Sequence, residues 1–250
     1  MSGHSKWHSI RHKKAAVDAK RGRMFTKLIR EISTAARIGG GDINSNPRLR
    51  TAVTAAKASN MPADNIDRAI KKGTGELPGV TYEEATYEAY GPGGVAILIE
   101  TLSDNKNRTI AEIRHIVNKH AGNMAEAGSV SWMFDSKGVI QVDAATHNED
   151  ELLELALESG AEDLVREGEY FEITTAPGDL EAVKEALETA EIEMISAEFA
   201  QVPKSVVQIA GKEASQLLRL MNGIEDQEDV QKVWANFDIP DEELDSVDLS

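Results

Sequence analysis

The sequence contains no cysteine, which excludes disulfides, thiolate metal ligands and cysteine nucleophiles. It also contains no apolar run of the roughly 18 residues that a transmembrane helix needs. The first residues lack the apolar segment of a secretory signal. Residues 1–17 are basic and free of acids, as in a transit peptide, but this pattern continues into a capped helix. We therefore expect a cytoplasmic protein without membrane contact.

Sequence motifs of the common enzyme classes are missing as well. There is no Walker A lysine, no G-x-S-x-G and no H-E-x-x-H. The glycine-rich run at Gly91–Gly94 does not open a helix and is typical of a turn. His4, His8 and His12 are spaced four apart, but without nearby carboxylates they would make a poor metal site. We therefore predict a protein that is not an enzyme and holds no metal, cofactor or small-molecule substrate.

What the sequence does have is a strong separation of charge. The chain has 250 residues and a net charge of −16. Residues 1–75 hold 16 Lys and Arg against 5 Asp and Glu, a formal charge of +11, which leaves −27 for residues 76–250. Such a distribution is typical of a polyanion-binding module attached to an acidic body. The alternative is that the opposite charges hold the two parts together.

The basic part has the pattern of three helices. Apolar residues recur at helical spacing over Met24–Ile38, and a run of three glycines ends that pattern. Asn46 and Pro47 supply a cap and a first-turn proline for a second helix. A third helix begins at Pro62 and is expected to stop at Gly73. The Gly- and Pro-containing stretch that follows, to Val80, indicates a linker.

The acidic part alternates strands and helices. A wholly apolar strand at Val95–Ile99 precedes a helix from Asn107 to about His120, and a further strand is predicted at Ser129–Phe134. From Gly138 the order is β-α-β-β-α-β, the ferredoxin-like pattern. The strand, helix and strand after Pro203 cannot form a core alone, so we expect them to complete the first sheet.

The predicted fold class is therefore α+β. An all-helical amino-terminal domain is followed by two α/β sandwich domains, one of them ferredoxin-like and inserted in the other. The predicted boundaries are residues 1–75 for the basic helical domain, 76–136 plus 204–240 for the discontinuous α+β domain, 137–203 for the inserted ferredoxin-like domain, and 241–250 for an acidic tail.

The candidate site is a row of cations on the first helix. At about 100° per residue, Arg23, Lys27, Arg30 and Arg37 fall in one sector opposite the apolar face, and cations at this density favour phosphate contact. The alternative is a solvated helix face, which usually mixes charge signs. Trp7 could stack on a base or pack as the anchor of an amino-terminal arm. The predicted nucleic-acid-binding residues are Lys6, Trp7, His8, Arg11, Lys13, Lys14, Lys20, Arg21, Arg23, Lys27, Arg30 and Arg37.

A second candidate lies in the polar loop that joins the apolar strand to its helix. Lys106, Asn107 and Arg108 could hold an anion at the start of that helix. The alternative is a local structural role, in which Asn107 caps the helix and Asn105 forms a turn.

Several of these motifs together resemble the YebC family. The resemblance rests on GHSKWHSIRHKK at Gly3–Lys14, on DAKRG at Asp18–Gly22, on YGPGG at Tyr90–Gly94 and on DNKNRT at Asp104–Thr109. It implies a three-domain α+β protein of the cytoplasm. Bacterial members are described as transcriptional regulators, and the family also includes mitochondrial translational activators of cytochrome oxidase. It supplies no catalytic residues.

We therefore expect a nucleic-acid-binding regulator of gene expression, in the first instance a DNA-binding transcriptional regulator. The alternative is a ribosome-associated translation factor that binds ribosomal RNA through the same basic face. DNA and RNA present the same phosphate charge, so the expected partner is one of the two.

Overall fold

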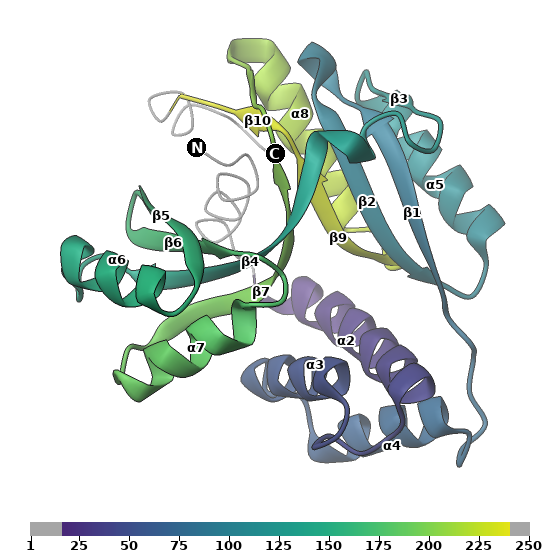
Figure 1. Cartoon of the computed structure of the whole chain (residues 1–250). Coiled ribbons are helices and arrows are strands. Elements are labelled where there is room, and N and C mark those ends of the chain that lie inside the picture. The colour runs from purple at the N-terminus through teal and green to yellow at the C-terminus, as the bar shows by residue number, and fades with distance from the viewer. Residues whose placement is uncertain (1–16, 241–250) are drawn as a thin grey trace. The chain divides into compact units, whose positions relative to one another are not determined.

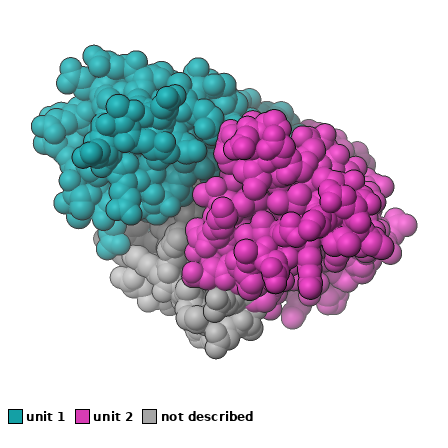
Figure 2. All heavy atoms as spheres, turned by 90° about the horizontal axis from the view of Figure 1, so that it is seen from below, with its two compact units in different colours: residues 1–13, 130–211, 234–247 teal, residues 14–129, 212–233, 248–250 magenta. Residues whose placement is uncertain are grey.

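A computed structural model describes residues 17–240, with side chains from residue 22 onward. The described residues form two compact units, which are coloured separately in Figure 2. The unit that comes first along the chain, magenta in Figure 2, comprises residues 17–129 and 212–233 and is called the first unit below. The second unit, teal in Figure 2, comprises residues 130–211 and 234–240. The predicted boundary near residue 75 lies inside the first unit, so the division into three domains stays a prediction.

The first unit begins with the three helices that the apolar spacing predicts (Figure 1), namely α2 (Val17–Gly39), α3 (Pro47–Ala58) and α4 (Ala63–Thr74). Ile32, Leu49 and Val53 lie in their common core. Asn46 caps α3 by accepting a hydrogen bond from the backbone N–H of Leu49 at 3.1 Å. Its Nδ2 donates to the carbonyl of Ala35 at 2.9 Å, so one side chain joins α2 to α3.

A glycine brings α4 against α2. A Cβ atom added at Gly73 would lie 2.3 Å from the carbonyl oxygen of Ser33, which only glycine avoids. The prediction that Gly73 ends the helix is wrong, because α4 runs on to Thr74 and the cap is Gly75, at φ +83°. Gly73 therefore serves close helix packing, whereas Gly75 provides the left-handed turn.

The rest of the first unit is a sheet with two helices. Its strands are β1 (Glu83–Tyr90), β2 (Ala96–Ser103), β3 (Asn123–Met124) and β9 (Val230–Ala235), in the order β3-β1-β2-β9. The helices are α5 (Lys106–Lys119) and α8 (Gly211–Glu225). Because β9 lies beside β2, the expectation that the returning chain completes the first sheet is confirmed.

Two strands of this sheet were not predicted. β1 reads EEATYEAY, and most of its first residues are exposed, so its sequence shows no alternation of apolar and polar residues. One of its buried positions is the acidic Glu88, whose carboxylate accepts a hydrogen bond from the N–H of Gly128 at 2.7 Å. The other unpredicted strand, β3, has two residues, too few for any periodicity to be visible.

The second unit has the predicted ferredoxin-like order. Its main elements are β4 (Phe134–Asp143), α6 (Glu149–Glu158), β5 (Ala161–Glu167), β6 (Tyr170–Thr175), α7 (Leu180–Thr189) and β7 (Met194–Pro203). The sheet order is β5-β6-β4-β7, and its neighbours are antiparallel. Two short strands, β8 (Val207–Gln208) and β10 (Phe237–Asp238), pair in parallel in the same unit.

The strand predicted at Ser129–Phe134 is wrong. A 3₁₀ turn occupies Ser131–Met133, and β4 begins only at Phe134. Val130 and Phe134 are buried, whereas Trp132 between them is 63% exposed. Buried residues four apart suit a helical turn, whereas a strand that buries one face would bury Trp132 as well.

Candidate nucleic-acid interface

The structure shows what the cation row on α2 contacts. Arg23 lies 3.3 Å from the carboxylate of Asp226, and the Nζ of Lys27 donates to the backbone carbonyl of Glu225 at 2.6 Å. Arg30 is only 8% exposed. These three cations therefore face the acidic segment of residues 225–229, at the end of α8 and in the loop that follows. The prediction of an exposed row is wrong for Arg30, because a helical wheel finds the polar face but not what packs against it.

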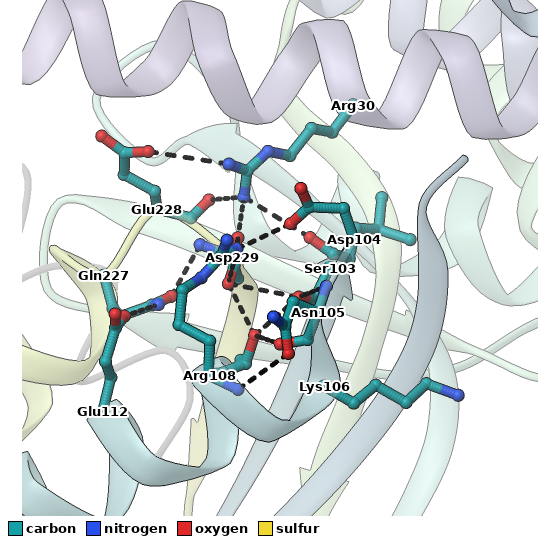
Figure 3. Close-up of polar contacts among 12 residues, drawn as sticks. Arg30, Ser103, Asp104, Asn105, Lys106, Arg108, Glu112, Gln227, Glu228 and Asp229 are labelled. Carbon is teal, nitrogen blue, oxygen red and sulfur yellow. Dashed lines mark hydrogen bonds and ion pairs between the residues drawn. The ribbon is translucent and has the colours of Figure 1, made fainter. Parts of the chain in front are cut away.

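Arg30 belongs to a buried polar network around Asp229 (Figure 3). The side chain of Asp229 is 1% exposed, and it accepts from Arg30 and, at 2.9 Å, from Arg108. The hydroxyl of Thr109 donates to it at 2.6 Å, and that of Ser103 lies 3.3 Å away. We call these five residues the Asp229 cluster. It joins α2, the end of β2, the start of α5 and the 226–229 loop.

The cluster keeps Asp229 ionised. Burial raises the pKa of its carboxyl, but the hydrogen bonds from Arg108 and Thr109 and the charge of Arg30 outweigh burial. The resulting pKa lies below the ordinary value of an aspartate. A charge that is both buried and fully partnered is typical of a structural ion pair.

The second candidate, the loop at Lys106–Arg108, is engaged by the protein itself. Arg108 binds Asp104 at 2.7 Å in addition to Asp229, and Lys106 binds Glu83 at 2.7 Å. Capping by Asn107 is wrong, because α5 begins one residue before it and Asn105 is the cap, accepting from the N–H of Arg108 at 3.1 Å. This geometry favours the structural alternative for the loop, while its role as a contact stays a prediction.

Other cations of α2, α3 and α4 are open to solvent. Five exposed side chains of these three helices form no ion pair with Asp or Glu within residues 22–240, namely Arg37, Arg50, Lys57, Arg68 and Lys72. By contrast, Arg48 binds Glu31 through two nitrogens and Glu84 at 2.7 Å, and Lys71 binds Asp67 at 2.7 Å.

Four of these exposed cations, Arg50, Lys57, Arg68 and Lys72, were missed by the sequence reasoning. Residues 48–72 hold six Lys and Arg against two Asp, a signal that was visible in the sequence. They are divided between α3 and α4, so they do not form a row along the face of one helix, which is the pattern that the sequence prediction used.

Several predicted residues lie outside the described part of the chain, namely Lys6, Trp7, His8, Arg11, Lys13 and Lys14. Lys20 and Arg21 lie in α2, but their side chains are not described. The nucleic-acid role of all predicted residues stays a prediction.

None of the described helices is long and apolar enough to cross a membrane. Nor do residues 22–240 bring together three or more His, Asp or Glu side chains that could hold a metal ion.

Fold and site together define an α+β protein with a basic helical module (α2 to α4) and an acidic sheet module (β1, β2, β3, β9, α5 and α8). The buried ion pair of Arg30 with Asp229 joins the two modules. Residues 5–76 match the family model described as the TACO1/YebC protein N-terminal domain. Residues 82–237 match the model of the TACO1/YebC second and third domain. The chain belongs to the TACO1/YebC family.

Relatives match nearly the whole length of the chain. A "probable transcriptional regulatory protein" of Desulforapulum autotrophicum is 58% identical over 99% of this chain and 100% of its own. A protein of Geobacter sulfurreducens with the same description is 57% identical over 99% and 100%. The crystal structure of a conserved hypothetical protein from Aquifex aeolicus matches with a TM-score of 0.83 and 49% identity, covering 91% of this chain and 94% of that one. These matches confirm the predicted family and fold class.

Proposed function

We propose that this protein is a non-catalytic regulator of gene expression that binds nucleic acid, in the first instance DNA, through its basic helical module. The observation that carries the proposal is the charge separation, +11 over residues 1–75 against −27 over the rest. A duplex releases condensed counterions when cations neutralise its phosphates, so a surface of this kind gains affinity without reading bases.

The structure changes which residues we assign to the binding surface. Arg30 is buried, and Arg23 and Lys27 contact the acidic segment 225–229, so we do not assign these three cations to the surface. We assign the surface instead to the exposed cations of α3 and α4, represented by Arg50 and Arg68, together with the amino-terminal basic residues from Lys6 to Lys14.

The names of the relatives support DNA as the target and transcription as the process, since the two cited above are called probable transcriptional regulatory proteins. A ribosome-associated translation factor would use the same cations on ribosomal RNA, and the experiment below separates the two. We expect the protein to act in the cytoplasm.

The test is a salt titration of binding to a random duplex, a selected promoter and purified ribosomes. A variant with Arg50, Lys57 and Arg68 changed to Gln removes three exposed charges. Its matched control changes Arg114, Lys119 and Lys212 to Gln, which are exposed cations of the sheet module in the same unit. If each removed cation contacts one phosphate, the slope of log affinity against log salt falls by about 2.7 in the first variant and stays unchanged in the control.

Each outcome has a defined meaning. A promoter preferred over random duplex at raised salt supports a transcriptional regulator, because base contacts are screened less than phosphate contacts. Ribosome binding that persists at the salt at which DNA is released supports a translation factor. Binding that does not respond to salt in any of the three would contradict the electrostatic mechanism.

A further inference from the structure

A pocket of about 220 Å³ lies where α2 and α4 meet the segment that leads to β1. Ser33, Thr34 and Arg37 line it from α2, and Lys72 and Gly73 from the end of α4. The remaining lining residues are Gly75, Leu77 and residues 79–82. The close approach at Gly73 creates this geometry, because it brings the end of α4 against the carbonyl of Ser33. We call it the Arg37 pocket.

The lining of the Arg37 pocket is cationic and free of carboxylates. Arg37 and Lys72 are both exposed, and neither forms an ion pair within residues 22–240. Arg37 donates through Nη2 to the carbonyl of Tyr82 at 3.0 Å, which orients the guanidinium and leaves its other N–H groups available. Glu83 follows the lining residues, but its carboxylate is bound to Lys106 at 2.7 Å.

A buried hydroxyl at the same place has no partner. Thr34 is 1% exposed, and its Oγ1 has no hydrogen-bond partner. Such a group costs stability unless something satisfies it. A threonine in a helix adopts either of two χ1 rotamers. Rotation about χ1 therefore lets the hydroxyl of Thr34 point toward a ligand in the pocket that this residue lines.

We propose that the Arg37 pocket binds a phosphoryl group. A guanidinium matches phosphate oxygens with paired N–H groups, and an ammonium adds a second positive charge. The hydroxyl of Thr34 supplies a neutral donor, and Gly75 and Gly79 let the backbone approach closely because they have no side chain. The phosphoryl group belongs either to a nucleic-acid backbone or to a free phosphorylated molecule, since both present the same oxygens.

The test uses the full chain and inorganic phosphate as the probe. Isothermal titration gives the affinity, and the amide resonances of Gly73, Gly75 and Gly79 report the location. We expect saturable binding that shifts these amides. Arg37→Gln and Lys72→Gln should each weaken binding by about tenfold or more, because each removes a charge-assisted contact. Arg114→Gln is the matched control, an exposed cation of α5 outside both the pocket and the proposed binding surface, and should bind as the wild type does.

Thr34→Val separates binding from packing. Valine keeps the branched shape and removes the hydroxyl, so phosphate binding should weaken while thermal stability stays equal or rises. Absence of saturable phosphate binding, or an equal loss in Arg114→Gln, would overturn the proposal. So would phosphate binding that Thr34→Val, Arg37→Gln and Lys72→Gln all leave unchanged.

A second arm identifies the source of the phosphoryl group. If a short DNA duplex displaces the bound phosphate, the group belongs to a nucleic-acid backbone, and the pocket is part of the proposed interface. If the duplex leaves the phosphate in place, the ligand is a free phosphorylated molecule. Phosphate binding at the pocket is then supported independently of the proposed nucleic-acid binding. Conversely, DNA binding with no phosphate binding would remove the pocket and leave the proposed function standing.

Discussion

Arg30 and Arg37 lie seven residues apart on the same helix, yet their surroundings differ completely. Arg30 is 8% exposed and bound to the buried carboxylate of Asp229. Arg37 is exposed, contacts a backbone carbonyl and lines a pocket without acids. Two arginines of one predicted row therefore have different roles, one in a buried ion pair and the other at an exposed pocket. A cation that meets a buried carboxylate holds the fold together, whereas one that meets none stays available to a ligand.

The largest expected effect follows from removing the carboxylate at the centre of the Asp229 cluster. Asp229→Ala removes the buried carboxylate that Arg30 binds, and breaking a buried ion pair costs about 3–5 kcal/mol of unfolding free energy. Asp226→Ala is the matched control, because that carboxylate is 52% exposed and pairs with Arg23 at the surface, so its loss should cost under about 1 kcal/mol. Urea denaturation of both variants measures the difference. Equal costs would mean that burial does not distinguish the two arginines.

Acid should weaken the same cluster. The pKa of Asp229 is lower in the folded protein than in the unfolded chain, so its contribution to stability is present above the unfolded value of about 3.9 and is lost as pH falls through the folded value. Asp229→Asn lacks this titration. Its stability deficit relative to the wild type should therefore shrink between neutral pH and about pH 3. Urea denaturation at both pH values checks this, and a deficit that grew on acidification would show the opposite pKa shift.

Two buried threonines provide a finer comparison. Thr109 donates to the Asp229 carboxylate at 2.6 Å, so Thr109→Val should cost about 1.5–3 kcal/mol. Thr34 has no partner, so the same substitution there should cost nothing or stabilise the protein. Thermal unfolding of the two variants side by side tests this. A matching loss in Thr34→Val would mean that its hydroxyl already has a partner.

The smallest effects should come from the cations of the Arg37 pocket. Arg37→Gln and Lys72→Gln should each change the unfolding free energy by no more than about 0.5 kcal/mol, because both cations are exposed and neither forms an ion pair within residues 22–240. A cost comparable to that of Asp229→Ala, measured by the same denaturation, would place Arg37 among the structural cations.

Much of the fold was predictable because it depends on local pattern. The apolar spacing of α2 and the Asn46–Pro47 start of α3 are helix signals. The apolar run of β2 and the β-α-β-β-α-β order of the second unit identified the sheets. Local pattern failed where a few residues decide the outcome. The turn at Ser131–Met133 and the two-residue strand β3 are too short for periodicity to show.

The sequence by itself determined the family, the fold class and the concentration of cations in the first 75 residues. Only the tertiary structure decided which of those cations remain available. Asp229 lies 199 residues after Arg30, and Lys72 lies 35 residues after Arg37, so neither neighbour could be inferred from spacing along one helix. Charge is a property of composition, but its neutralisation depends on which carboxylates the fold brings within a few ångströms, because Coulomb attraction acts through space and not along the chain.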